Sequence, residues 1–204
     1  DNQNKIEEIV DLIQQKKFND AENKVLTLLE SKKDASLINL YGIILLEQKN
    51  YHDAITKFKL ALNYDPNFVK SYNNLGIVLH KLEKYHDACK NYQKAIKINP
   101  DFFEAYNNMG VSLIELRKYN NAEKYFKKSI SIRSNFLDPY VNLGKLLVKI
   151  NNFTEAIKYF QKALQLKKND PKIIHSLGLA YKKNLEYKIA ESKFKLAIKL
   201  NPNF

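Results

Sequence analysis

All five glycines of this chain are spaced 34 residues apart, at Gly42, Gly76, Gly110, Gly144 and Gly178. An alanine follows each glycine after twelve residues, at Ala54, Ala88, Ala122, Ala156 and Ala190. Aromatic residues flank each alanine, three residues before it and four residues after it. A fixed period of this length is typical of stacked copies of one supersecondary unit. The sequence therefore predicts a repeat array rather than a domain with a single core.

Each repeat contains two stretches of helical periodicity. Residues 35–49 place Ile38, Tyr41 and Leu45 at helical spacing, and Phe58 and Leu62 continue the pattern in the next stretch. Each unit is therefore predicted to be a pair of helices. Glycine costs about 0.5–1 kcal/mol in a helix relative to alanine, so its recurrence indicates a packing requirement. We expect the repeat glycine and alanine on facing sides of the hairpin, where small side chains let the backbones approach.

Prolines mark the junctions between units. Three pairs are predicted to end a second helix, because proline cannot continue its hydrogen bonding: Asp65-Pro66, Asn99-Pro100 and Asn201-Pro202. Asp138-Pro139 and Asp170-Pro171 are instead predicted to start a helix, with aspartate as the N-cap and proline in the first turn. Regular units then cover residues 35–68, 69–102, 103–136, 137–170 and 171–204.

This pattern resembles the tetratricopeptide repeat family over all five regular units. The aromatic residue that the family carries in the first helix is present as Tyr72, Tyr106 and Tyr140, whereas Ile38 and Ile174 depart from it conservatively. The resemblance implies an all-α fold: a right-handed α-solenoid of stacked antiparallel helix hairpins, with about six repeats. It also implies that the first helices line a concave surface.

The two ends of the array depart from the regular pattern. Residues 1–34 are predicted to form a divergent sixth unit that acts as an N-terminal cap, with an acidic residue or Ile9 at the glycine position. No polar helix follows the last unit, so apolar surface is expected around Leu196, Ala197 and Leu200. We expect a longer natural protein, and exposed terminal hairpins are a possible route to homo-oligomers.

Asparagines recur at the fifth and sixth positions of the middle units. The candidate partner-binding residues on the concave side are Asn73, Asn74, Asn107, Asn108, Asn142, Lys70, Lys145 and Lys149. A carboxamide both donates and accepts hydrogen bonds, so a ladder of them can hold an extended peptide backbone. The ladder is similar to that in the repeat arm of O-linked N-acetylglucosamine transferases, at Asn74, Asn108 and Asn142. The alternative is that asparagine is simply a tolerated residue in an Asn-rich chain.

The chain is strongly basic, with a formal net charge of +12. Nearly all of its basic residues are lysines, and the only arginines are Arg117 and Arg133. Specific readers of nucleic acid depend on arginine, so no specific nucleic-acid partner is predicted. A lysine stripe on the second helices (Lys90, Lys94, Lys97, Lys124, Lys128, Lys158 and Lys162) is either an ordinary solvated surface or a docking site for an acidic protein, a membrane surface or RNA.

No catalytic, cofactor or metal motif is recognisable. The His-Asp pairs His52-Asp53 and His86-Asp87 occupy one repeat position near a helix start, where aspartate favours the helix dipole. No apolar run is long enough to cross a membrane. A single cysteine, Cys89, fits a reducing compartment, so we expect a cytoplasmic or nuclear protein without a cofactor.

Two classes of function remain open at this point. The first is an interaction scaffold that binds an extended peptide or a helix of a partner protein in the concave groove. The second is a substrate-recruiting arm of a larger enzyme such as a glycosyltransferase. Weak electrostatic binding to RNA or to an acidic surface is a further alternative, and it predicts strongly salt-dependent affinity.

Overall fold

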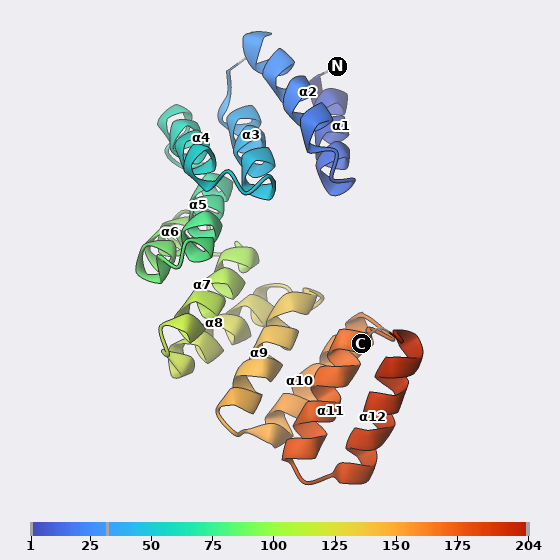
Figure 1. Ribbon diagram of the computed structural model, residues 1–204. Helices are drawn as coiled ribbons and strands as arrows, with labels where there is room; N and C mark the ends of the chain where they lie inside the picture. Colours follow the sequence, from blue (N-terminus) through green and yellow to red (C-terminus); the bar gives the residue numbers. More distant parts are fainter. Residues whose placement is uncertain (1, 32, 203–204) are drawn as a thin grey trace. The chain divides into compact units, whose positions relative to one another are not determined.

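The computed structural model describes residues 2–31 and 33–202, in which all regular secondary structure is helical (Figure 1). The helices are α1 Asn2–Gln14, α2 Phe18–Ser31, α3 Ala35–Glu47, α4 Tyr51–Tyr64, α5 Val69–Lys81, α6 Tyr85–Ile98, α7 Phe103–Glu115, α8 Tyr119–Ile132, α9 Leu137–Lys149, α10 Phe153–Leu166, α11 Pro171–Lys183 and α12 Tyr187–Leu200. The prediction of an all-α repeat fold is thus confirmed.

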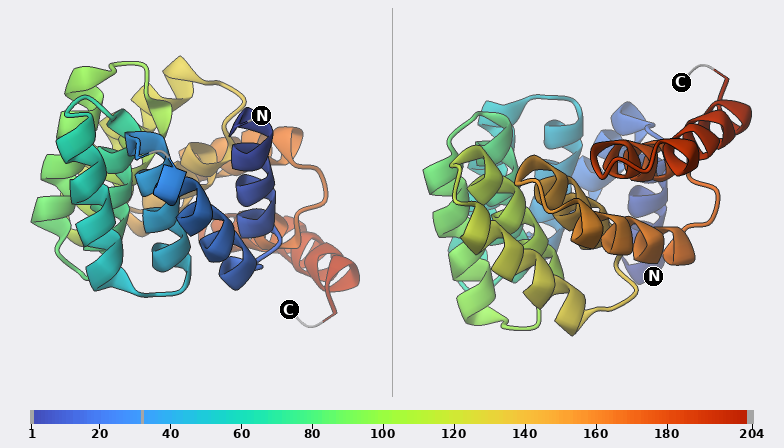
Figure 2. Two further views of the ribbon diagram at one scale, coloured as in Figure 1. Left: turned by 90° about the horizontal axis from the view of Figure 1, so that it is seen from above. Right: turned by 90° about the horizontal axis from the view of Figure 1, so that it is seen from below.

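The chain divides into two compact units, an N-terminal unit of residues 1–100 and a C-terminal unit of residues 101–204. The N-terminal unit contains α1 to α6, and the C-terminal unit contains α7 to α12. Within each unit the consecutive helices pack as antiparallel hairpins, and each hairpin packs against the next (Figures 1 and 2). The odd-numbered first helices also contact one another inside a unit.

A single left-handed residue turns the chain between the two helices of each regular hairpin. Lys49, Glu83, Arg117, Asn151 and Leu185 have φ between 57° and 66°. At the first of these turns the amide of Lys49 donates to the carbonyl of Leu46 at 3.0 Å, and the amide of Asn50 donates to that of Leu45 at 2.8 Å. These bonds satisfy carbonyls that the end of a helix leaves unpaired. No glycine has a positive φ, so the glycines serve packing rather than the turns.

The repeat glycine faces an aromatic ring of the second helix. A Cβ built on Gly42 would lie 2.5 Å from Cε1 of Phe58, and one on Gly144 would lie 2.7 Å from Cε1 of Phe160. The sequence analysis placed the glycine and the repeat alanine on facing sides of the hairpin and did not predict this contact with the ring. The glycine makes room for the aromatic residue four positions after that alanine. The repeat alanines, which lie one helical turn before these aromatic residues, are also buried.

The junctions follow the predictions with one exception. Asp65, Asn99 and Asn201 are the C-caps of α4, α6 and α12, and Asp170 is the N-cap of α11 with Pro171 in its first turn. Asp138 is not an N-cap, because α9 begins one residue earlier, at Leu137. Pro139 then occupies the third helical position. A proline is tolerated there because the first four amides of a helix have no intrahelical acceptor.

The N-terminal hairpin fills its core by a different pair of residues. Ile9 occupies the position of the repeat glycine, and Val25 occupies that of the aromatic residue. Both are fully buried, and they share one apolar cluster with Leu37 and Ile44 of α3. A larger first residue is thus matched by a smaller second one, which preserves the volume of the core.

The last hairpin exposes apolar side chains, as predicted, although they differ in part from those expected. Leu196 and Leu200 are exposed, whereas Ala197 is completely buried because its short side chain packs inside the hairpin. The most exposed apolar side chains are instead Leu185 at 71% and Tyr187 at 60%. Phe204, the last residue of the chain, lies outside the described residues.

Candidate functional site

The asparagine pairs of the first helices have one buried and one accessible member. At the fifth repeat position, Asn39, Asn73 and Asn107 are only 3%, 7% and 5% exposed. At the sixth position, Asn74, Asn108 and Asn142 are half-buried. Asn73 and Asn107 therefore have little surface to offer a partner. Of the five predicted binding asparagines, only the three at the sixth position have accessible amide surface.

In the N-terminal unit, a buried amide joins two first helices. Oδ1 of Asn39 in α3 accepts a hydrogen bond from Oγ of Ser71 at 2.9 Å and from Nδ2 of Asn74 at 3.0 Å, both in α5. Ser71 is completely buried. A buried donor without an acceptor costs about 1–3 kcal/mol, so Asn39 stabilises this junction. Sequence analysis did not single out Asn39 or Ser71 for this role.

The C-terminal unit repeats the arrangement. Nδ2 of Asn142 in α9 donates to Oδ1 of Asn107 in α7 at 3.0 Å, and Nδ2 of Asn107 donates to Oδ1 of Asn108 at 3.3 Å. Val141 of α9 and His175 of α11 take the place of asparagine at the fifth position of the last two repeats. The accessible amides of Asn74 and Asn142 are consequently fixed in orientation by bonds to buried asparagines.

The three predicted binding lysines are exposed on first helices. Lys70 lies near the start of α5, and Lys145 and Lys149 lie one turn apart on α9. Nζ of Lys149 is 5.5 Å from the ring centroid of Tyr119, which is a favourable cation–π distance. Over residues 2–31 and 33–202, none of the three takes part in an ion pair.

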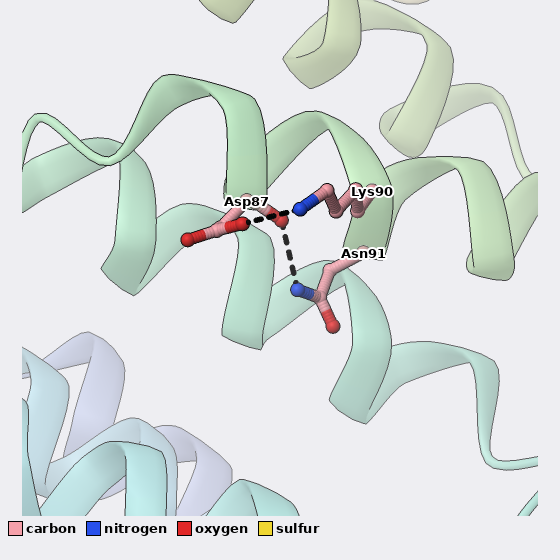
Figure 3. Close-up of polar contacts among 3 residues, drawn as sticks. All are labelled: Asp87, Lys90 and Asn91. Atoms are coloured by element: carbon pink, nitrogen blue, oxygen red, sulfur yellow. Dashed lines mark hydrogen bonds and ion pairs between the residues drawn. The ribbon is translucent and has the colours of Figure 1, made fainter.

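Several second-helix lysines are neutralised by an acid on their own helix. In α6, Nζ of Lys90 pairs with Oδ1 of Asp87 at 3.0 Å, and Nδ2 of Asn91 donates to the Asp87 carbonyl at 2.8 Å (Figure 3). The hydrogen bond from Lys90 lowers the pKa of Asp87. Similar pairs occur in α8, α10 and α12: Lys127–Glu123, Lys158–Glu155 and Lys195–Glu191. Exposed pairs of this kind contribute little stability and are typical of a solvated surface.

Two tyrosines of the first helices, Tyr106 and Tyr140, are not available for stacking on bases. Tyr106 and Tyr140 are 8% and 7% exposed. Burial raises the pKa of both phenols, and the neighbouring Tyr125 and Tyr159 raise it further. The hydroxyl of Tyr140 donates to the carbonyl of Ser134 at 2.8 Å. These rings belong to the core of the C-terminal unit.

Side chains suitable for metal chemistry do not gather anywhere in the described part of the chain. No group of three or more His, Cys, Asp or Glu residues is placed to hold a metal ion there. His52 and His86 are exposed near the starts of α4 and α6. The aspartates beside them are Asp53, which shares a hydrogen bond with Asn50, and Asp87, which pairs with Lys90.

Comparison with family models decides the classification. A model described as "TPR repeat" matches residues 42–83 and 78–116, and one described as "Tetratricopeptide repeat" matches residues 101–169. Together the matches run from 42 to 169, more than half of the chain. The chain belongs to the tetratricopeptide repeat family. A search of curated protein sequences finds no match for this tetratricopeptide repeat chain.

Several solved structures share the fold of this tetratricopeptide repeat chain. PilF of Pseudomonas aeruginosa is 18% identical and matches with a TM-score of 0.84, over 99% of this chain and 92% of that one. MamA is 23% identical with a TM-score of 0.71, over 79% and 95% of the two chains. YrrB, described as "a TPR protein with an unusual peptide-binding site", is 19% identical with a TM-score of 0.67, over 87% and 92%. At these identities the likeness concerns the fold.

The helices of this tetratricopeptide repeat chain are short. Among the described residues, no helix has the length and apolar character needed to cross a membrane.

Proposed function

We propose that this chain is a protein-interaction scaffold whose first helices bind an extended segment or a helix of a partner protein. One observation carries the proposal: the accessible amides of Asn74 and Asn142 are held in place by buried asparagines one repeat earlier. An amide whose orientation is already fixed loses little conformational entropy when a partner binds. Its free edge can hydrogen-bond a peptide backbone without regard to the side chains of the peptide.

The structural likeness to YrrB supports this proposal at the level of the fold, because YrrB is described as having a peptide-binding site. Family membership also favours a scaffold, since a stack of hairpins presents a long row of equivalent first-helix positions. No partner is identified by either likeness. The test must therefore begin with capture of partners rather than with a chosen ligand.

The test compares two triple variants in affinity capture from a lysate. The binding variant is Asn74→Ala/Asn108→Ala/Asn142→Ala. The control is Asn63→Ala/Asn121→Ala/Gln165→Ala, which removes three exposed amides from the second helices α4, α8 and α10. We expect the binding variant to lose proteins that the wild-type chain and the control retain. Equal capture by all three proteins would exclude the first-helix asparagines as the binding site.

Folding must be checked separately, because Asn74 and Asn142 also stabilise helix junctions. Circular dichroism and a thermal melt identify a variant that has lost structure. If the triple variant is unstable, a bulky substitution at Ser176, a half-buried sixth-position residue of α11, replaces it. A bulky side chain at Ser176 blocks the surface without removing one of these asparagine bonds.

A further inference from the structure

The last two first helices carry an excess of positive charge. Helix α11, Pro171–Lys183, contains Lys172, Lys182 and Lys183 and no acidic residue. Helix α9, Leu137–Lys149, contains Lys145 and Lys149, and its only acid is Asp138 in the first turn. We call Lys145, Lys149, Lys182 and Lys183 the lysine quartet. All four side chains are exposed.

The quartet is not neutralised within the protein. None of its members forms an ion pair in the described ranges 2–31 and 33–202, whereas α8, α10 and α12 each pair a lysine with a glutamate. Lys145 and Lys149 are separated by four residues on one helix, a spacing at which like charges destabilise the helix. The same spacing of lysines occurs on the second helices, at Lys90–Lys94 and Lys124–Lys128, so α9 and α11 differ in that no lysine of either helix forms an ion pair within the described residues.

The helix dipole accounts for only part of this pattern. Lys149, Lys182 and Lys183 lie in the last turns of α9 and α11, where a positive charge is favourable. Lys145 lies in the middle of α9, outside the last turn, and gains nothing from that effect. The helix dipole therefore favours three of the four lysines and not Lys145.

Apolar side chains lie at the same repeat positions as the quartet. Leu179 of α11, 41% exposed, occupies the position of Lys145, and Val148 of α9 occupies that of Lys182. Helices α9 and α11 contact each other. The surface therefore combines four cations with apolar area, which suits a segment containing both carboxylates and apolar side chains.

We propose that α9 and α11 bind an acidic, extended segment of another protein, with the lysine quartet facing its carboxylates. This inference rests on the proposed scaffold function and specifies the chemistry of the partner. A nucleic acid fits less well, because α9 and α11 contain no arginine and their tyrosines, Tyr140 and Tyr181, are buried. Stacking on exposed aromatic rings and bidentate arginine contacts are the usual means of holding bases.

The test uses a random peptide library displayed on beads and the fluorescently labelled full chain. The binding variant is Lys145→Gln/Lys149→Gln/Lys182→Gln/Lys183→Gln. The control is Lys59→Gln/Lys124→Gln/Lys128→Gln/Lys162→Gln, which removes the same charge from exposed positions on α4, α8 and α10. All eight lysines are exposed, so both variants are expected to fold, and circular dichroism verifies this.

We expect the wild-type chain and the control to select peptides rich in Asp and Glu, and the binding variant to lose about tenfold in affinity for them, since four exposed charge pairs of modest strength disappear. The same loss in the control would overturn the inference, because net charge alone would then explain binding. Selection of acidic peptides that survives in the binding variant would also overturn it.

Failure of the inference and failure of the proposed function give different results. If the library yields peptides without acidic preference, and the Asn74→Ala/Asn108→Ala/Asn142→Ala variant loses them, the scaffold stands and the acidic partner is wrong. If no peptide is selected and affinity capture also finds no partner, both proposals fail. A third result would assign the surface to RNA. In that case no peptide is selected, labelled oligouridine binds the wild-type chain tightly, and the Lys145→Gln/Lys149→Gln/Lys182→Gln/Lys183→Gln variant does not bind it.

Discussion

The ring of Phe126 occupies the space that a side chain on Gly110 would need. A Cβ added to Gly110 would lie 2.6 Å from Cε1 of the ring, which is far inside the contact distance of two carbon atoms. Phe126 is fully buried, so the ring has no open space into which to move. In the N-terminal hairpin the same two positions hold Ile9 and Val25, so a larger residue in the first helix packs with a smaller one in the second; both are fully buried.

This relationship predicts that Gly110→Ala destabilises the protein although alanine is the better helix former. The gain in helix propensity is about 1 kcal/mol, and overpacking of a core typically costs about 1–3 kcal/mol. We expect a net loss of about 1 kcal/mol in the free energy of unfolding, measured by urea denaturation. A more stable Gly110→Ala protein would show that the ring adjusts without cost.

The pair in the N-terminal hairpin supplies the complementary experiment. Gly110→Ile/Phe126→Val transfers the Ile9–Val25 combination to α7 and α8. We expect the double variant to be more stable than the sum of the two single changes predicts, by about 1 kcal/mol or more, because one residue grows as the other shrinks. Additive effects in the double-mutant cycle would mean that the two positions do not share one space.

The buried amide of Asn39 is expected to be more important for stability than the accessible one of Asn74. Asn39→Ala leaves the hydroxyl of Ser71 and the amide of Asn74 without their acceptor and should cost about 1–3 kcal/mol. Asn74→Ala leaves the acceptor with one remaining donor and should cost less. Thermal melts of both proteins, with the exposed Asn63→Ala as control, compare these costs; equal melting temperatures for the first two would contradict the prediction.

Asp170, the N-cap of α11, should make the free energy of unfolding depend on pH in the acidic range. Burial opposes ionisation of Asp170, but hydrogen bonds from Lys167 and from the amides of Ile173 and Lys172 outweigh it, so its pKa lies below the ordinary value of 3.8. The folded state thus binds the proton more weakly than the unfolded state. This stabilisation is fully present above 3.8 and is lost as the pH falls through the folded-state pKa.

Two substitutions at this position separate the cap from the charge. Asp170→Ala removes the acceptor of the first-turn amides and should cost about 1 kcal/mol at neutral pH. Asp170→Asn keeps an acceptor, loses the ion pair with Lys167 and should unfold with a weaker dependence on pH in the acidic range. Urea denaturation at neutral and acidic pH tests both; an unchanged pH dependence in Asp170→Asn would rule out this carboxylate as its source.

Equivalent apolar positions in α10 and α12 should respond differently to a polar residue. Leu164 is half-buried, whereas Ile198, one repeat later, is 53% exposed. We expect Leu164→Gln to cost about 1–2 kcal/mol and Ile198→Gln to stay within about 0.5 kcal/mol. If Ile198→Gln instead destabilises the chain in a concentration-dependent way, analytical ultracentrifugation should reveal self-association through α12.

The 34-residue period determined the repeat units and the all-α class, because small and large residues at fixed spacing permit one hairpin geometry. It also identified Asp170 as an N-cap but misassigned Asp138, since proline is compatible with several positions in a first turn. The lysine–acid pairs of the second helices are of the kind that sequence can predict, because each joins residues three or four positions apart on one helix.

The adjacent asparagines at the fifth and sixth repeat positions show most clearly what the sequence alone does not predict. Asn73 and Asn74 are identical in chemistry and adjacent in sequence, yet one is buried and the other half-accessible. Successive residues of a helix point about 100° apart, so the fate of each depends on where the neighbouring helices lie. A first helix in a stack contacts its own partner and adjoining hairpins, and therefore buries more than one stripe. The sequence by itself determined which residues repeat, whereas the tertiary structure decided which of them remain available to a partner.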